Sequence, residues 1–284
     1  MISETANKLT FVNPRNDIAF KKIFGSENHT ELLLEFLNQV LEREEPILEV
    51  EILNPFQLPR TRGLKLTTLD IKARDKRDEF LIEMQVEKES WFAQRVVYYV
   101  SKAYATQLKQ ARNYAELKPV IFLGILNFRE FPGKNIFTRH QHINDKTGNN
   151  DLRQIELNFI ELPHFTKTES ELTSLTDQWM YFFKNAENLD QIPESVTSER
   201  LREAYSTLNE HNWSPQELEA YEHSAIKEQA RENSIETARL EGKAEGKAEG
   251  KAELVRAMLK NGISMQKISE LTGLSLTEIA RLKS

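Results

Sequence analysis

The segment "LDIKARDKRDEFLIEMQV", residues 69–86, decides the fold, because it has the pattern of two strands joined by a tight turn. With Lys76 and Arg77 as a two-residue turn, Asp70 on the first strand lies directly opposite Glu83 on the second. Opposed side chains on one face of an antiparallel pair are about 5 Å apart. Two carboxylates at that distance repel each other, so this register predicts a positive charge between them.

The second strand has alternating faces. Its two faces carry Phe80, Ile82 and Met84 on one side and Leu81, Glu83 and Gln85 on the other. Two interpretations follow for the acids. They hold a divalent cation, which prefers carboxylate oxygens, or they lie on a solvent-facing hairpin and pair with Lys72 or Arg74. The sequence DKRD is not a favoured two-residue turn, and a shifted register would separate the acids.

Composition narrows the class of protein. The chain has 284 residues, 39% of them hydrophobic, which suffices for one large domain with or without appendages. It has no cysteine, which excludes disulfides and thiolate chemistry. No apolar run reaches the roughly 18 residues of a membrane span, and the first residues lack a signal-peptide pattern. We therefore expect a soluble, cytoplasmic protein without a membrane partner. The net charge of −6 argues against a general polyanion binder, but it does not exclude an enzyme with a carboxylate cluster.

Periodicity predicts an α/β domain over residues 10–187, followed by a helical extension over 188–240. Helical spacing covers 17–43, with a break near Gly25–Ser26, and recurs at 91–117, 168–187 and 198–240. Strand-like stretches lie at 47–53, 65–74, 79–87, 120–128 and 152–162. The polar stretch 129–151 is typical of a loop.

Residues 241–253, "EGKAEGKAEGKAE", repeat the unit AEGK. Glycine at every fourth position weakens a helix by about 1 kcal/mol each relative to alanine. The repeat is therefore interpreted as a solvated linker or helix. The alternative is an oligomer seam along the glycines.

Residues 254–284 form a small helical tail in which basic residues outnumber acidic ones. Gly262 is expected to end one helix, Gly273 marks a tight turn, and Ser275 with Glu278 fits a capping box before the last helix. The pattern is similar to a helix-turn-helix, which would contact DNA. A packing or dimerisation module is the alternative, and it predicts a homo-oligomer through the C-terminal helices.

The hairpin and its continuation, "TLDIKARD" and "EFLIEMQVEKESWFAQRVVYYVSKAYATQL", closely resemble the Rpn family of recombination-promoting nucleases, also described as PD-(D/E)XK nuclease family transposases. The stretches "NPRNDIAFKKIFG", "YAELKPVIFLGILNF" and "FIELPHF" extend the resemblance over roughly residues 10–240. It implies a restriction-endonuclease-like core, with a mixed central sheet flanked by helices and a helical C-terminal extension.

The resemblance also implies roles for individual residues. Asp70 corresponds to the first metal-binding acid of the motif and Glu83 to the second. Gln85 stands where the wider superfamily has lysine, although the E-x-Q form is common in this family. Glutamine can orient a water molecule but carries no charge, so Lys72 or Lys102 would supply the missing one.

Further positions match family features on two helices. Asp17 matches an acid of the first helix and would be a third metal ligand, or alternatively a helix N-cap. Gln94, Arg95, Tyr98 and Tyr99 lie on the helix after the hairpin, where related nucleases use a Gln-x-x-x-Tyr pattern to shape the site and contact phosphate. Arg95 can bind phosphate in a bidentate manner, whereas the aromatic side chains can equally be core packing.

The resemblance implies a Mg²⁺-dependent DNA endonuclease, with Mn²⁺ or Ca²⁺ as alternative ions, that acts in DNA recombination or on mobile elements. The rival hypothesis is a catalytically inactive DNA-binding or oligomeric protein that retains the nuclease fold. The missing motif lysine favours the rival, and the opposed acids argue against it. Cleavage of RNA would use the same chemistry.

Overall fold

The computed structural model describes residues 10–54, 70–108 and 113–283. The chain divides into two compact units, the first running to Ala225 and the second from Ile226 onward. The long helix α6, Pro215–Lys260, begins in the first unit and ends in the second. Each unit has its own hydrophobic core.

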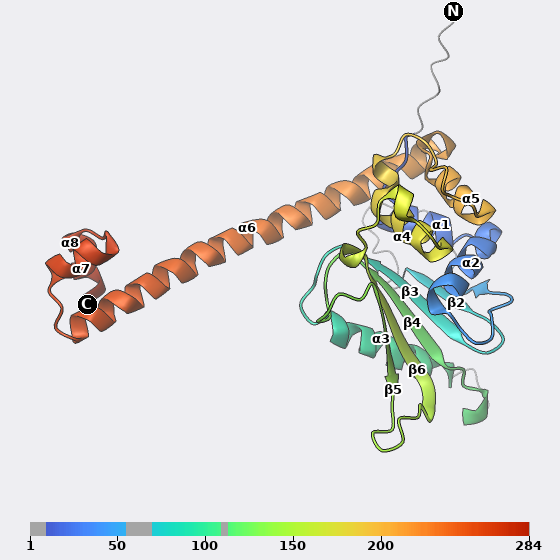
Figure 1. The fold of residues 1–284 in the computed structure, drawn as a ribbon, viewed down its shortest axis with the longest axis horizontal. Coiled ribbons are helices and arrows are strands. Elements are labelled where there is room, and N and C mark those ends of the chain that lie inside the picture. The colour runs from blue at the N-terminus through green and yellow to red at the C-terminus, as the bar shows by residue number, and fades with distance from the viewer. Residues whose placement is uncertain (1–9, 55–69, 109–112, 284) are drawn as a thin grey trace, which may run out of the picture. The chain divides into compact units, whose positions relative to one another are not determined.

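The first unit is built on one sheet and the helices around it (Figure 1). Its strands are β1 Glu51–Ile52, β2 Ile71–Arg74, β3 Glu79–Gln85, β4 Val120–Leu126, β5 Phe137–His142 and β6 Leu152–Glu161. Its helices are α1 Asp17–Phe24, α2 Thr30–Leu41, α3 Phe92–Gln107, α4 Leu175–Asn185 and α5 Glu199–Leu208. Short 3₁₀ turns occupy Glu27–His29, Tyr114–Glu116, Leu162–His164, Glu169–Glu171, Ala186–Asn188 and Glu210–Asn212.

The six strands form one mixed sheet in the order β1-β2-β3-β4-β6-β5. β3 and β4 are parallel and are joined by α3, as a parallel connection requires. β4 and β6 are also parallel, whereas the outer pairs are antiparallel. The expected α/β class with a mixed central sheet is therefore confirmed.

The predicted hairpin register is confirmed. Ile71 pairs with Ile82 and Arg74 with Glu79, so the next pair outward brings Asp70 opposite Glu83. The carboxylate of Asp75 stabilises the unfavoured turn sequence by accepting the backbone N–H of Arg77 at 2.8 Å and that of Asp78 at 2.6 Å. Residues 65–69 of the predicted first strand lie outside the described residues.

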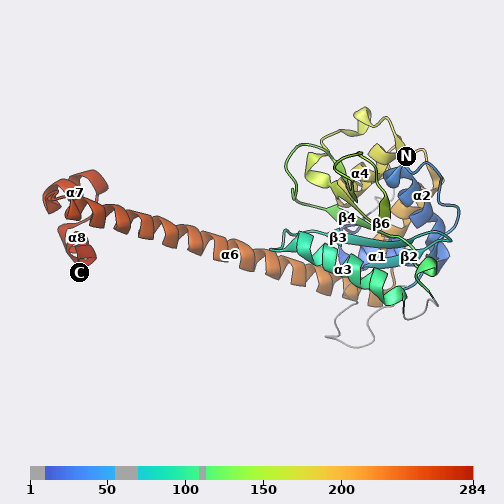
Figure 2. The same cartoon turned by 90° about the horizontal axis from the view of Figure 1, so that it is seen from below.

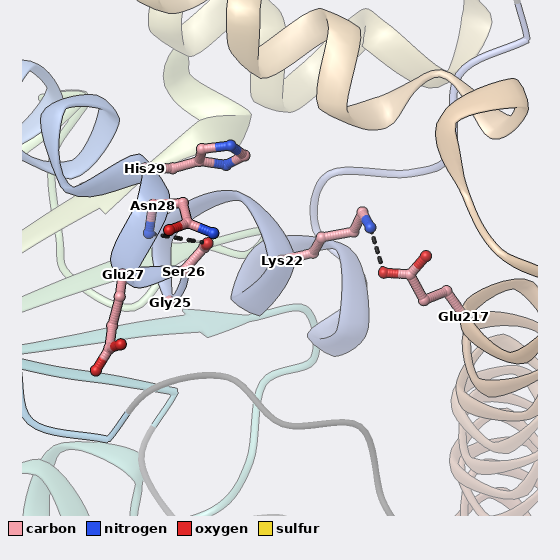
Figure 3. A pocket seen from close by; sticks show the side chains of 7 residues that line it. All are labelled: Lys22, Gly25, Ser26, Glu27, Asn28, His29 and Glu217. Atoms are coloured by element: carbon pink, nitrogen blue, oxygen red, sulfur yellow. Dashed lines mark hydrogen bonds and ion pairs between the residues drawn. The ribbon is translucent and has the colours of Figure 1, made fainter.

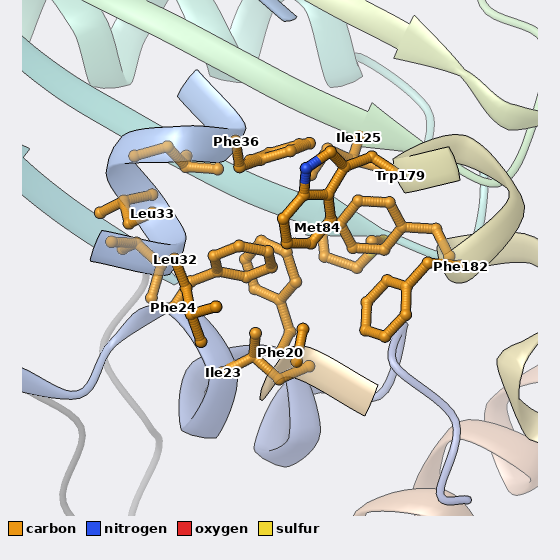
Figure 4. Packing of buried hydrophobic residues seen from close by; sticks show 14 of the residues in the cluster. Phe20, Ile23, Phe24, Leu32, Leu33, Phe36, Met84, Ile125, Trp179 and Phe182 are labelled. Carbon is orange, nitrogen blue, oxygen red and sulfur yellow. The ribbon is translucent and has the colours of Figure 1, made fainter. Parts of the chain in front are cut away.

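Helices cover both faces of the sheet (Figure 2). α1, α2, α4 and α5 enclose the larger core on one face, where rings from three helices meet: Phe24, Phe36 and Trp179 (Figure 4). α3 covers the opposite face, where Val96 and Val100 pack with Phe122 of β4. β3 divides as its alternation predicts, since Met84 belongs to the larger core and Leu81 to the smaller one.

Several element boundaries differ from the sequence prediction. The predicted loop 129–151 contains the edge strand β5, whose half-buried and exposed side chains give no hydrophobic alternation. The predicted helix 198–240 is interrupted after α5, where Trp213 is buried and its indole N–H donates to the Thr207 carbonyl. The helix predicted over 91–117 ends at Gln107, and the one over 168–187 begins at Leu175, behind a capping box. The strand predicted over 47–53 is reduced to Glu51–Ile52.

The second unit contains the rest of α6, then α7 Met265–Thr272 and α8 Leu276–Lys283. The AEGK repeat is helical, and all residues from 229 to 250 are exposed. Val255, Ile268 and Ile279 form a small core between the three helices. Gly273, at φ +67°, makes the turn between α7 and α8, a conformation that favours glycine. Within the described part of the chain, no helix has the length and apolarity of a membrane span.

Candidate active site

Asp70 and Glu83 lie side by side where β2 meets β3. Asp70 immediately precedes β2, and its Oδ2 accepts the backbone N–H of Met84 at 2.9 Å. Glu83 lies within β3 and is 5% exposed, on the face that carries α3. Since the Met84 side chain is anchored in the larger core (Figure 4), packing there fixes the amide that holds Asp70.

Lys21 of α1 completes this group of charges. Its Nζ lies 3.2 Å from Oδ1 of Asp70 and also pairs with Asp17, one helical turn before it. The Lys21 residue is only 5% exposed. α1 presents both charged side chains because Asn16, rather than Asp17, is the N-cap: its side chain accepts the N–H of Ile18. The alternative of Asp17 as the N-cap is therefore wrong.

The buried acids have strongly altered acidity. Burial, reinforced by the Asp70 carboxylate, raises the pKa of Glu83 from 4.5 to about 8 against the opposing effect of Arg95 and Lys21. Burial also raises the pKa of Asp70 from 3.8 to about 6, although Lys21 opposes this change. Burial alone would lower the pKa of Lys21, but Asp70 and Asp17 together raise it above 10.5. The positive charges of Lys21 and Arg95 therefore do not fully balance the negative charges of the two ionised acids.

The donor set fits a divalent cation. The Glu83 carboxylate accepts no hydrogen bond from any residue that the structure describes, and Asp70 has oxygens of the same hard type. When Asp17, Asp70 and Glu83 are all ionised, Lys21 cancels one of their three negative charges and leaves two. Asp17 pairs with Lys21 and also lies next to the Asp70 carboxylate, whose pKa it helps to raise. Within the described ranges, no three acidic, histidine or cysteine side chains form a metal-binding group.

Gln85 joins the acids to α3 through Arg95. Its Oε1 accepts a hydrogen bond from Nη2 of Arg95 at 2.9 Å, and its Nε2 donates one to the Glu87 carbonyl at 3.1 Å. Arg95 also pairs with Glu89 and lies over the Phe92 ring. Arg95 is therefore fixed beside Glu83, and Gln85 positions it.

The structure does not bring the other sequence candidates to the acids. Lys72 points along the hairpin and pairs with Glu79 at 3.0 Å. On α3, Gln94 and Lys102 are exposed, with Lys102 over the Tyr98 ring at 5.9 Å. Tyr99 is half-buried and packs against Tyr98.

Sequence reasoning missed Lys21. The signal available was its spacing of four residues from Asp17, which places both on one face of a helix. Nothing in the sequence showed that this face would meet the hairpin. Sequence reasoning also missed Gly124 of β4, which pairs with Glu83 of the neighbouring strand β3. A Cβ at Gly124 would approach the rings of Phe122 and Phe159 at 2.9 and 3.1 Å, so a larger residue would disturb this part of the sheet.

A pocket of about 320 Å³ lies elsewhere in the first unit (Figure 3). It is lined by Lys22, Gly25, Ser26, Glu27, Asn28, His29 and Glu217. Lys22 and Glu217 form an ion pair across it. None of the acids described above lines this pocket, so it is separate from the candidate active site.

Comparisons with known proteins agree with this geometry. The model of the PD-(D/E)XK nuclease family transposases matches residues 14–238, and the model of the Rpn/YhgA-like nuclease family C-terminal HTH domain matches residues 256–284. No curated protein and no solved structure matches the chain significantly. The first match covers most of the chain and includes the opposed acids, and the second covers α7 and α8. The chain therefore belongs to the PD-(D/E)XK nuclease family transposases and carries the helix-turn-helix domain of the Rpn/YhgA-like nucleases.

Proposed function

We propose that this protein is a divalent-metal-dependent DNA endonuclease that hydrolyses phosphodiester bonds in the cytoplasm, in DNA recombination or on mobile elements. The observation that carries the proposal is the juxtaposition of Asp70 and Glu83, with Lys21 buried against Asp70. Family membership supports a nuclease-like activity, and the helix-turn-helix domain supports DNA as the partner. Residues 10–187 would form the catalytic body.

Asp70 and Glu83 would hold the cation, with Mg²⁺ as the expected ion and Mn²⁺ or Ca²⁺ as alternatives. When bound, such an ion activates water and offsets negative charge on the phosphate. Asp17 would support the site from α1, because it pairs with Lys21 and its carboxylate also lies next to that of Asp70. The core beneath Met84 keeps Asp70 in place, so the site is preorganised.

Lys21 supplies the positive charge that Gln85 lacks. A buried ammonium beside the attacked phosphate stabilises the charge that develops as water adds to phosphorus and the bond to the leaving oxygen breaks. Gln85 instead positions Arg95, whose guanidinium is suited to phosphate. Lys72 pairs with Glu79 instead of the acids, so it would not supply this charge.

DNA binding would be divided between the two units. The helix-turn-helix of α7 and α8 holds duplex DNA. Arg95 of α3 would contact the strand near the acids. Gln94, Tyr99 and Lys102 would contact it farther along the helix. The exposed C-terminal helices would also support a homo-oligomer.

Plasmid cleavage tests this function. Purified protein is incubated with supercoiled plasmid and Mg²⁺, beside the Asp70→Ala and Glu83→Gln variants and an EDTA control. The matched control is Asp145→Asn, which alters an exposed acid with 82% of its side chain accessible. We expect nicking or linearisation by wild type and Asp145→Asn only, and none in EDTA.

The same assay separates the rival function. Wild type that is inert with Mg²⁺, Mn²⁺ and Ca²⁺, yet binds the plasmid, would make the protein a DNA-binding member that has lost catalysis. Cleavage that persists in Asp70→Ala would remove Asp70 from the site.

A further inference from the structure

An aromatic and basic stripe runs along the outer side of α3. Its members are Trp91, the residue that precedes the helix, and Tyr98 and Lys102, which lie four residues apart on one face of α3. Trp91 is 74% exposed and Tyr98 is 60% exposed. The Lys102 ammonium lies over the Tyr98 ring, 5.9 Å from its centre.

Packing of the first unit does not explain this stripe. The opposite side of α3 supplies the core contacts, through Phe92, Val96, Val100 and Ala103. Trp91 also has a left-handed backbone, φ 66° and ψ 23°, which is unfavourable for a bulky residue. Strained residues and exposed large aromatic residues are both concentrated at functional sites.

The charge of the stripe suits a polyanion. α3 contains no acidic residue, and its two basic residues are Arg95, which pairs with Glu89, and the exposed Lys102, although the whole chain has a net charge of −6. Basic side chains among exposed rings are the combination that binds single-stranded nucleic acid: the charges follow the backbone, and the bases stack on the rings.

Arg95 links the N-terminal end of the stripe to the candidate active site. The backbone N–H of Arg95 donates to the Trp91 carbonyl at 3.0 Å, and its guanidinium donates to Gln85, two residues beyond Glu83. The first turn of α3 therefore links the exposed indole to the strand that carries Glu83. A nucleic acid strand that reaches the acids at this end of α3 would meet Trp91.

We infer that Trp91, Tyr98 and Lys102 form a stacking surface for unpaired bases, so that the substrate at the acids is single-stranded or locally opened DNA. This inference rests on the proposed nuclease function, because it specifies the substrate of that site. It assigns duplex DNA to the helix-turn-helix and unpaired DNA to α3.

Tryptophan fluorescence tests the inference without any cleavage. Of the three tryptophans, Trp179 is fully buried and Trp213 is 6% exposed, so Trp91 is the one that an added base can reach. The full-length protein in EDTA is titrated with oligothymidine of about 12 nucleotides, within the usual site size, and with a duplex of equal length. We expect the single strand to quench the emission and the duplex to leave it unchanged.

Variants identify the residues involved. Trp91→Ala and Tyr98→Ala should each weaken oligothymidine binding about tenfold, measured by anisotropy of a labelled strand. Trp91→Phe and Tyr98→Phe keep a ring and should retain affinity. Tyr114→Ala, at an aromatic position 78% exposed outside α3, is the matched control and should match wild type.

Unchanged emission on saturation, or equal affinity of Trp91→Ala and wild type, would overturn the inference. So would loss of self-association in Trp91→Ala with oligothymidine binding intact, because the stripe would then contact a second copy of the chain. Because these measurements exclude metal, quenching by a protein that cuts no plasmid would refute the nuclease function and leave the stacking surface standing.

Discussion

The Lys21 ammonium lies 3.2 Å from Oδ1 of Asp70, and this contact joins the first helix to the strand pair that carries the acids. The same ammonium pairs with Asp17, so a single buried cation serves two carboxylates while Glu83 receives no direct partner from the described residues. A buried lysine persists only when it is paired. Lys21 is therefore part of the candidate site, together with the two acids that pair with it.

Replacing Lys21 tests whether its charge supports cleavage. Lys21→Met keeps most of the side-chain volume and removes the ammonium. We expect plasmid cleavage to fall about 100-fold, the effect of losing one electrostatic group from a site of this kind. Ca²⁺ affinity, measured by calorimetry, should not fall, because an opposing positive charge has been removed.

Lys72→Met is the matched control, since Lys72 is also a lysine of this region but pairs with Glu79. It should retain most of the cleavage activity. A result in which Lys72→Met loses activity and Lys21→Met does not would assign the missing charge to Lys72.

The candidate site depends on two contacts, the strand pair that opposes Asp70 and Glu83 and the contact of Lys21 with Asp70, and only the first was predictable from the sequence. The strand pair was predictable, because alternation and turn length are local and together predict the register in which Asp70 lies opposite Glu83. The contact of Lys21 was not, because it depends on how α1 packs against the sheet. The edge strand β5 was missed for a related reason: its exposed residues, such as His140 and His142, carry no hydrophobic period. The fold was therefore predictable from the family resemblance, whereas the position of the Lys21 charge follows only from the packing of α1 in the folded protein.

The stability of the metal-free protein should depend on pH through Glu83. Its pKa is raised in the folded state, so its contribution to stability is fully present below 4.5 and is lost as the pH rises to about 8. Asp70 acts in the same direction between 3.8 and about 6. In EDTA, thermal unfolding should therefore occur at a lower temperature at pH 8 than at pH 5.

Glu83→Gln isolates this effect from other titrating groups. The amide imitates the protonated acid, so the melting temperature of the variant minus that of wild type should grow by roughly 10 °C between pH 5 and pH 8. A difference that stays constant with pH would show that Glu83 titrates normally and that burial does not raise its pKa.

A divalent cation should remove this pH dependence and stabilise the fold. An ion that binds only the folded protein raises its stability by mass action. Saturating Ca²⁺ should raise the melting temperature of wild type at pH 8 by about 5–10 °C. Asp70→Asn and Glu83→Gln should show little change, and the exposed control Asp145→Asn should respond like wild type. Equal responses of all four proteins would mean that the ion binds elsewhere.

The register that opposes Asp70 and Glu83 should depend on Asp75, because its carboxylate accepts both backbone N–H groups of the turn, those of Arg77 and Asp78. Asp75→Ala removes these bonds and should cost about 1–2 kcal/mol, or roughly 5 °C in melting temperature. Asp75→Asn keeps an accepting oxygen and should remain close to wild type. A looser turn permits other registers, which separate the acids, so Asp75→Ala should also weaken Ca²⁺ binding although residue 75 is not a ligand. If Asp75→Ala melts and binds Ca²⁺ like wild type, cross-strand packing alone sets the register, and the turn only follows it.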